Sequence, residues 1–324
     1  MRRGLFARET ALLGVLAVIT ALFGAFVDGF SLLGALDRAR YWVATGMIAV
    51  PMTFIIATAG IDLSVGSIVA LCGIVLGLLY RDAGWPIAAA ACGAVIVGLA
   101  AGAINGGVSS YVGVPPLVVT LATMALFRGI AMGLTKAAPV KDLPATFQWL
   151  GQGDAFRVDL GTFGVLYVPI AIFALIACVV LGWILLRKTW VGRFTECIGE
   201  NEIAAEFAAI DPRRLKLALY AACGAVCGAA ALFHTALFAT AKADTAKGLE
   251  LEVIACVVVG GTRISGGQGS VIGSLLGLLI IGILRYGLYM AGMRSQYVII
   301  VVGALLIVMA VLNEWMASSK GEKR

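Results

Sequence analysis

Long runs of apolar residues, separated by short polar stretches, make up most of this chain. A helix needs roughly 20 apolar residues to cross a bilayer, so the pattern predicts about ten transmembrane helices. Their ranges are 10–28, 42–59, 65–80, 86–110, 116–134, 164–186, 215–238, 249–260, 270–290 and 297–314. For the short segments 65–80 and 249–260, which are bounded by glycine-rich turns, a partial or broken helix is the alternative. The predicted fold is an all-α polytopic membrane protein with a single transmembrane domain over residues 1–324.

Two polar segments interrupt this pattern. Segment 187–216 is dense in charged residues of both signs, and within it Ile203, Phe207 and Ile210 recur at helical spacing. We expect a short amphipathic helix there that meets a soluble partner. Segment 135–163 is polar and contains prolines, and it is predicted to be a loop that either connects two helices or contacts an external partner.

The composition agrees with a membrane protein. The chain is 61% hydrophobic and 13% charged, and its mean hydropathy is +1.01. A soluble domain cannot hide that much apolar surface, because a folded globule still needs a polar exterior. The net charge of +6 is spread along the chain without a basic patch, which argues against nucleic acid as a partner. The lipid bilayer is therefore the expected surroundings.

The distribution of Lys and Arg predicts the orientation. Basic residues gather at the N-terminus, at the C-terminus and in 187–216. We therefore expect both termini and 187–216 on the cytoplasmic side, and 135–163 on the periplasmic side. The first apolar run lacks a small-residue cleavage site, so we expect it to be retained as a span.

Two glycine-interrupted segments resemble each other. One follows the second predicted span and contains Gly66-Ser67; the other follows the eighth and contains Gly269-Ser270. In each, a glycine turn precedes the Gly-Ser pair and an apolar helix follows it. Corresponding interruptions in two halves are typical of duplicated transporter folds with a pathway between the halves. The sequence thus predicts an internal duplication.

Some polar residues lie within or beside the predicted spans. Asp62 is either a functional carboxylate at membrane depth or a cap for the helix that begins near Ser64. Asn105 lies in a run of small residues, where it either bonds between helices or contacts the substrate. Arg128 lies inside an apolar span and should face protein or water.

Two further charges lie near the predicted outer ends of spans. Glu252 opens the eighth predicted span, where a carboxylate meets the positive end of the helix dipole favourably. Arg285, in the ninth, can extend its guanidinium toward the membrane interface. The candidate pathway and turn residues are Asp62, Ser64, Asn105, Arg128, Glu252 and Arg285.

The sequence carries no pattern typical of catalysis or metal binding. His234 is the one histidine, and Cys223 and Cys227 lack a second pair of ligands, so we expect no metal site. The run ISGGQ at 264–268 looks like the signature motif of ABC ATPases, but the chain has no phosphate-binding loop. We expect neither an enzyme nor a directly bound cofactor; any ATP would bind a partner subunit.

Five stretches, in this order, resemble the inner-membrane permease subunits of ABC importers for ribose-type sugars, a family that includes rhamnose and autoinducer-2 permeases. They are AGIDLSVGSIVAL (59–71), GAINGGV (102–108), VPPLVVTLATMALFRGIAMG (114–133), GENEIAAEFAAI (199–210) and VIACVVVGGTRISGGQGSVIGSLLG (253–277). The resemblance implies a permease subunit of an importer that moves a monosaccharide or sugar-like molecule across the bacterial inner membrane. The implied partners are a separate ABC ATPase subunit, a periplasmic solute-binding protein and a second permease, identical or paralogous.

The resemblance also assigns residues to the contact with the ATPase. It implies that the docking helix contains Gly199, Glu200, Asn201, Ala204 and Ala205. From charge and periodicity we expect polar contacts from Glu200, Asn201 and Glu202, and apolar anchors from Ile203, Phe207 and Ile210.

Three places depart from the family pattern. Ala209 and Ala122 stand where relatives usually have glycine. In the ninth span, where many relatives have asparagine before Gly-Leu, this chain has Arg285-Tyr286-Gly287-Leu288. The departure at Arg285 leaves the identity of the substrate open.

The alternative function is an ion-coupled secondary transporter of a small polar solute. Such a carrier needs several acidic residues deep in its spans to bind protons or sodium. The candidates here are Asp62 and the outer Glu250 and Glu252, which disfavours this alternative.

Overall fold

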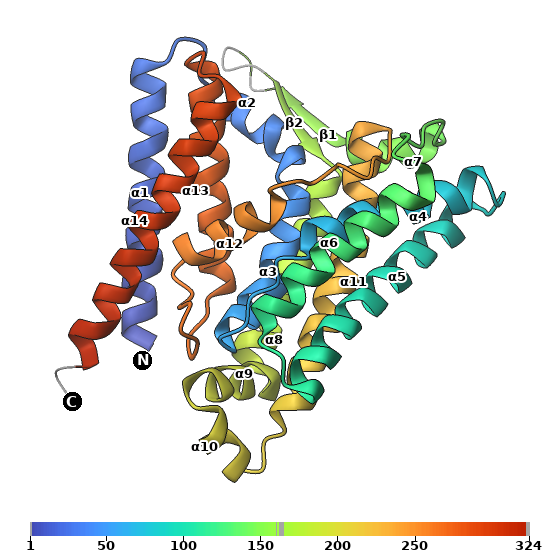
Figure 1. The fold of residues 1–324 in the computed structure, drawn as a ribbon. Coiled ribbons are helices and arrows are strands. Elements are labelled where there is room, and N and C mark those ends of the chain that lie inside the picture. Colours follow the sequence, from blue (N-terminus) through green and yellow to red (C-terminus); the bar gives the residue numbers. More distant parts are fainter. Residues whose placement is uncertain (1, 160, 162–164, 322–324) are drawn as a thin grey trace.

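The computed structural model of the protein describes residues 2–159, 161 and 165–321, and helices dominate this part (Figure 1). The helices, in chain order, are α1 (Arg2–Phe26), α2 (Leu32–Asp37), the 3-10 helix η1 (Arg38–Tyr41), α3 (Val43–Ala57), α4 (Val65–Arg81), α5 (Ile87–Gly107), the π-helix η2 (Val108–Val112), α6 (Pro116–Thr135), α7 (Ala145–Gln152), α8 (Ala171–Lys188), α9 (Trp190–Glu200), α10 (Glu202–Phe207), α11 (Pro212–Phe238), α12 (Leu249–Val259), α13 (Val271–Met290) and α14 (Ser295–Gly321). Each predicted span contains most of one of these helices, so the helical character was predicted correctly.

Fewer of the described helices are long enough to cross a bilayer than the sequence predicts. Six of the described helices are long and apolar enough to cross a bilayer alone. The segment formed by α2 and η1 meets α3 at a 69° bend, and if this bent pair is counted as one span the number is seven. The six are α1, α5 with η2, α6, α8, α11 and α13. Helix α4 is a shorter apolar helix, and α12 has 11 residues. These are the two segments for which the sequence left a broken helix open, and the span count of ten stays a prediction.

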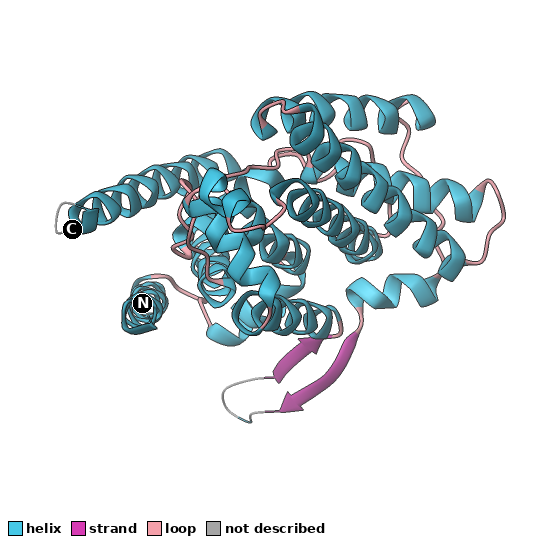
Figure 2. Cartoon of the chain, turned by 90° about the horizontal axis from the view of Figure 1, so that it is seen from below, coloured by secondary structure: helices cyan, strands magenta, loops and turns pink. Residues whose placement is uncertain are grey.

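A small β-hairpin is the one clear departure from the predicted all-helical pattern in the described residues. Strand β1 (Asp154–Asp159) pairs antiparallel with β2 (Val165–Pro169), and Figure 2 shows the hairpin projecting from one side of the bundle. The prediction of a helix starting at 164 was wrong. In the run from Val165 to Val168 the two valines are β-branched and Tyr167 is aromatic, which favours a strand once a partner is present. Helix α8 therefore starts only at Ala171.

Glycines allow α5 and α11 to pack backbone to backbone. A Cβ atom on Gly102 would collide with the carbonyl oxygen of Tyr220, and one on Gly98 with that of Gly224. This close approach is the one expected for the small-residue run near Asn105, because small residues let membrane helices approach closely. Helix α5 is thereby fastened along α11 at the outside of the bundle, whereas every residue of α3 is buried.

Two interruptions lie between α3 and α4 and between α12 and α13. Helices α3, α12 and α13 pack against one another. The hydroxyl of Ser270 caps α13 by accepting from the backbone N–H of Gly273 at 3.0 Å. Its predicted counterpart, Ser67, lies inside α4 and donates to the carbonyl of Ser64 at 2.7 Å. The matched Gly-Ser pairs thus stand at different points relative to their helices, and the internal duplication stays a prediction.

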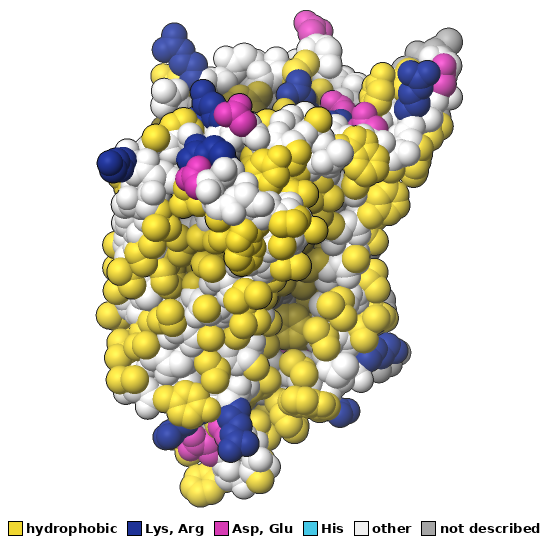
Figure 3. Space-filling model, turned by 90° about the vertical axis from the view of Figure 1, so that its right-hand side faces the viewer, with side chains coloured by type: hydrophobic (Ala, Val, Ile, Leu, Met, Phe, Trp, Pro, Cys, Tyr) yellow, Lys and Arg dark blue, Asp and Glu magenta, His cyan; other side chains and the backbone are white. Residues whose placement is uncertain are grey.

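The two ends of the molecule differ. The start of α1, the end of α14, and α9 and α10 lie at one end, whereas the hairpin and α7 lie at the other (Figure 1). Figure 3 shows that Lys, Arg, Asp and Glu side chains gather at both ends, with a mostly hydrophobic belt between them. Such a belt is what a bilayer requires of a spanning protein.

Candidate functional site

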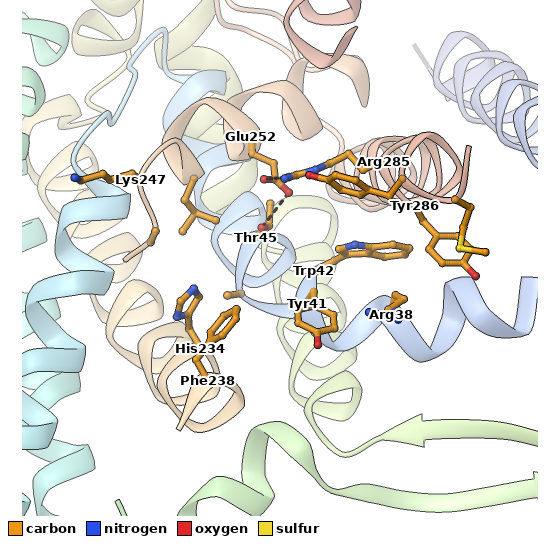
Figure 4. Close-up of a pocket in the computed structure, with 15 residues that line it drawn as sticks. Arg38, Tyr41, Trp42, Thr45, His234, Phe238, Lys247, Glu252, Arg285 and Tyr286 are labelled. Atoms are coloured by element: carbon orange, nitrogen blue, oxygen red, sulfur yellow. Dashed lines mark hydrogen bonds and ion pairs between the residues drawn. The ribbon is translucent and has the colours of Figure 1, made fainter. Parts of the chain in front are cut away.

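A cavity of about 490 Å³ opens among η1, α3, α11, α12 and α13 (Figure 4). Its lining is rich in rings, contributed by Tyr41, Trp42, His234, Phe238, Tyr286 and Tyr289. The ring centroids of His234 and Phe238 are 4.8 Å apart. Ligand sites combine such apolar walls with a few placed polar groups, and this cavity has the volume for a small molecule. We call it the outer cavity, after its place at the end of the molecule where Arg40 of η1 bonds α7 and β1.

An ion pair lies in the wall of the outer cavity. The guanidinium of Arg285 on α13 bonds the carboxylate of Glu252, which sits in the first turn of α12 (Figure 4). Thr45 on α3 lies beside the same carboxylate, its hydroxyl 3.5 Å from Oε1 of Glu252. The sequence named both charges but treated them separately. Packing of α12 against α13 supplies Arg285 with a carboxylate partner that the sequence did not anticipate, and its place relative to the membrane interface stays a prediction.

Arg128 lies outside the lining of this cavity. From α6, its Nη1 donates to the carbonyl oxygens of Ala243 at 2.8 Å and Thr245 at 2.6 Å. These carbonyls belong to the connection between α11 and α12, which also carries Lys247 of the cavity lining. Arg128 therefore positions one edge of the outer cavity, and it faces protein, as expected of an arginine in an apolar helix.

Asp62, Ser64 and Asn105 form a separate, fully buried cluster. Oδ1 of Asp62 accepts from the backbone N–H of Ser64 at 2.8 Å and from its hydroxyl at 2.6 Å. Nδ2 of Asn105 donates to the same hydroxyl at 2.7 Å. Oδ2 of Asp62 and Oδ1 of Asn105 have no hydrogen-bond partner among the described residues. The geometry is that of a turn before α4 that Asn105 ties to α5. Asp62 bonds the N-cap residue Ser64 and not an N–H inside the helix, so its interpretation as a helix cap stays a prediction.

At the end of the molecule away from this cavity, α9 and α10 project from the bundle (Figure 1); we call residues 190–207 the arm. Phe207 is 89% exposed and Ile203 is 68% exposed, both on α10. The chain then turns at Ala209, whose φ is +59°, and Ile210 lies half-buried beyond the turn. The prediction that Ile210 continues the same helix face was wrong, because α10 ends at Phe207.

Gly199 fastens the arm to the bundle. A Cβ atom at Gly199 would collide with the carbonyl oxygen of Ala57 at the end of α3 and with the amide nitrogen of Gly267. Gly267 itself donates to that carbonyl at 2.9 Å. This position therefore needs glycine for close packing within the chain.

Several polar residues of the arm form hydrogen bonds or ion pairs within the chain. Oδ1 of Asn201 caps α10 by accepting from the backbone N–H of Ala204 at 3.0 Å. Glu202 pairs with Lys216 at 2.7 Å. Among the other residues assigned to the contact with a partner, Ala205 is buried, whereas Glu200 and Ala204 are exposed. The surface that α10 offers is mainly apolar.

One further contact of the arm was not anticipated. Arg187 at the end of α8 lies 3.6 Å from the carboxylate of Glu196 on α9 and donates to the carbonyl of Gly269 at 3.1 Å. Burial raises the pKa of Glu196, and the charge of Arg187 opposes that rise. Spacing alone could not find this pair, because the turn at Thr189 sets the direction of α9.

No three His, Cys, Asp or Glu side chains in the described ranges gather so that they could hold a metal ion. The outer cavity offers rings, one ion pair, hydroxyls and the further cations Arg38 and Lys247. The arm offers an apolar contact surface.

Comparison with known proteins agrees with this architecture. Residues 34–310 match the family described as branched-chain amino acid transport system / permease component. Proteins named autoinducer 2 import system permease protein LsrD, from Escherichia coli K12, Escherichia coli O157:H7 and Shigella flexneri, are each 33% identical over 320 residues, covering 95% of this chain and 96% of the relative. No solved structure matches. The chain thus belongs to this family of transport permeases and is a multi-pass protein of a bacterial inner membrane.

Proposed function

We propose that the chain is the permease subunit of an ABC importer that moves a monosaccharide or sugar-like molecule into the cell. The observation that carries this proposal is the alignment with import-system permeases over 95% of the chain. Because the alignment is nearly complete, it includes both the outer cavity and the arm. A separate subunit would bind and hydrolyse ATP.

The membrane arrangement we propose has ten spans, an internal duplication and both termini in the cytoplasm. The start of α1, the end of α14 and the arm share one end of the molecule (Figure 1), which supports a common side for them. The outer cavity would then face the periplasm, where a solute-binding protein delivers its load. Transport would alternate access between the two sides as motion of the arm reaches the bundle.

The arm is proposed as the contact with the ATPase subunit. A phenylalanine that is 89% exposed on a six-residue helix gains little stability within the chain. Burial of such a ring against a partner is favourable at about 25 cal/mol per Å² of apolar surface. The arm is fastened to three helices: Gly199 packs on α3, Glu196 pairs with Arg187 of α8, and Glu202 pairs with Lys216 of α11. Motion applied at Phe207 would therefore reach these helices.

The outer cavity fits a sugar-like solute. The faces of Trp42 and Tyr41 can cover the C–H surface of a sugar ring, while Arg285, Glu252 and Thr45 can bond its hydroxyls. A second permease, as an identical copy or a paralogue, would complete the pathway.

Co-purification and uptake test this proposal. We expect Phe207→Ala to leave folding unchanged, since truncation of an exposed side chain alters stability by less than about 0.5 kcal/mol. It should weaken retention of the ATPase subunit and lower ATP-dependent uptake roughly tenfold or more, the effect of a contact worth about 1.4 kcal/mol. Val112→Ala, at a side chain 71% exposed on η2, is the matched control. Full uptake and full ATPase retention in Phe207→Ala would contradict the assignment of the arm.

The same preparation separates an importer from an ion-driven carrier. An importer keeps its uptake when ionophores collapse the ion gradients, provided that ATP is supplied. Uptake that stops when the ion gradients collapse would exclude the importer. If that uptake also persists in Asp62→Ala, a carrier that uses Asp62 is excluded as well.

A further inference from the structure

The outer cavity carries more positive than negative charge. Its lining contains Arg38, Lys247 and Arg285 but a single carboxylate, that of Glu252. Glu252 is bonded to Arg285, so these two charges largely cancel. Arg38 and Lys247 remain as the cations that determine the net charge of the cavity.

Neither of these cations has a carboxylate partner among the residues that the structure describes. By contrast, Arg40, two residues after Arg38, pairs with the carboxylates of Asp37 at 2.8 Å and Asp154 at 3.0 Å. Arg38 lies instead over the ring of Tyr41, with 6.0 Å between its guanidinium carbon and the ring centroid.

Arg38 and Lys247 come from different elements and lie at opposite edges of the cavity (Figure 4). Arg38 is on η1, whereas Lys247 is on the connection into α12. That connection is held by the two hydrogen bonds of Arg128 to its backbone. The cation at this edge is therefore on a fixed backbone segment.

We infer that the outer cavity selects a hydroxylated small molecule that carries a negative charge, such as a sugar acid. This inference rests on the proposed function and specifies its substrate class. Two unpaired cations at the edges of an apolar-walled cavity attract an anion and raise its local concentration. Arg285 bonds Glu252 through Nη1 and also bonds Tyr289. Because a guanidinium has five N–H donors, donors are left for a carboxylate of the solute. The rings then cover the uncharged face of the molecule.

Direct binding tests the substrate class. The full-length permease, in lipid nanodiscs with the subunits that co-purify, is titrated with glucose against glucuronate and with galactose against galacturonate. Each pair keeps the ring and exchanges a hydroxymethyl for a carboxylate. We expect at least one uronate to bind about fivefold tighter than its neutral partner, and Lys247→Gln or Arg38→Gln to reduce that preference two- to fivefold, as for a partly screened charge. Lys242→Gln, exposed on the same connection but outside the lining, should leave the preference unchanged.

The inference is overturned if no uronate binds, if both neutral hexoses bind as tightly as their acids, or if Lys242→Gln acts like Lys247→Gln. Binding of the hexoses and uronates is measured without ATP, so it does not depend on the ATPase subunit. If the arm fails to recruit an ATPase, the proposed function is overturned, but the measured preference for uronates is unchanged.

A second measurement reads the charge of the cavity without any solute. Phe238→Cys places a thiol in the lining, and Trp85→Cys places one on an outer turn beside the Arg81–Asp82 pair. Both are made with the exposed Cys92 and Cys197 replaced by serine. The rates of modification by anionic and cationic methanethiosulfonates are compared. We expect the anionic-to-cationic ratio at 238 to exceed that at 85 by about tenfold at low salt and to fall in Lys247→Gln. Equal ratios at the two positions would overturn the inference.

Discussion

The outer cavity and the arm use the same kinds of residue in opposite ways. In the cavity, aromatic rings face inward and the ion pair of Glu252 with Arg285 lies in the wall. In the arm, Glu202 is bonded back to Lys216 and Phe207 is turned outward. Both ion pairs are internal, but the rings of the cavity enclose a space whereas those of the arm face outward. Under the proposed function, the cavity takes a polar solute and the arm contacts an apolar protein surface.

The largest expected effect comes from loosening the arm. In Gly199→Val the new side chain would collide with the backbone at Ala57 and Gly267, and such overpacking costs about 1–3 kcal/mol or more. We expect the arm to separate from the end of α3 and ATP-dependent uptake to be almost lost while the protein still inserts. Uptake and limited proteolysis of the arm are the measurements.

The matched control is Gly303→Val on α14, where an added Cβ would meet nothing within 4 Å. If Gly199→Val transports as well as Gly303→Val, the fastening of the arm does not depend on this close packing.

Breaking the ion pair of the cavity should have the next largest effect. Arg285→Ala leaves Glu252, whose side chain is 19% exposed, without its cation. Loss of one partner of a buried pair costs about 3–5 kcal/mol, and partial exposure lowers the expectation here to about 1–3 kcal/mol. The thermal unfolding midpoint in detergent should fall accordingly.

The double variant Glu252→Gln/Arg285→Gln tests whether the cost arises from the unpaired charge. It should unfold at a higher temperature than Arg285→Ala, because no lone charge is left in the cavity wall. A double variant as unstable as the single one would mean that packing of the Arg285 side chain, and not its charge, stabilises the cavity.

The smallest effect concerns the turn that ends the arm. Ala209 adopts a φ of +59°, a conformation that costs a residue with a Cβ atom about 1 kcal/mol. Ala209→Gly should therefore stabilise the turn after α10, by about 0.5–1 kcal/mol. Protection of the local amides from hydrogen exchange measures it.

Ala208→Gly, one residue earlier at a φ of −82°, should have the opposite sign, since glycine there only adds freedom to the unfolded chain. The same sign for both variants would show that the left-handed backbone at Ala209 carries no cost.

The sequence predicted the class of the protein, the position of each main helix and the segment that forms the arm. It could do so because apolar runs of spanning length and a dense charged segment are local properties. It missed the hairpin that β1 forms with β2 (Val165–Pro169), since a short apolar run suits a strand or a buried helix equally until a pairing partner is known. It also extended the face of α10 to Ile210, because periodicity does not reveal a left-handed turn at an alanine.

What the sequence alone determined was therefore a helical membrane protein with a charged arm, because transfer of apolar runs into lipid depends on composition and length. What only the tertiary structure decided was which charges meet. Glu252 and Arg285 are 33 positions apart and Asp62 lies far in sequence from Asn105, yet the first two share a cavity wall and the second two a buried cluster. Arg38 and Lys247 line the same cavity from different elements. Contacts of this kind arise from helix packing, whose angles and distances depend on side chains distributed over the whole chain.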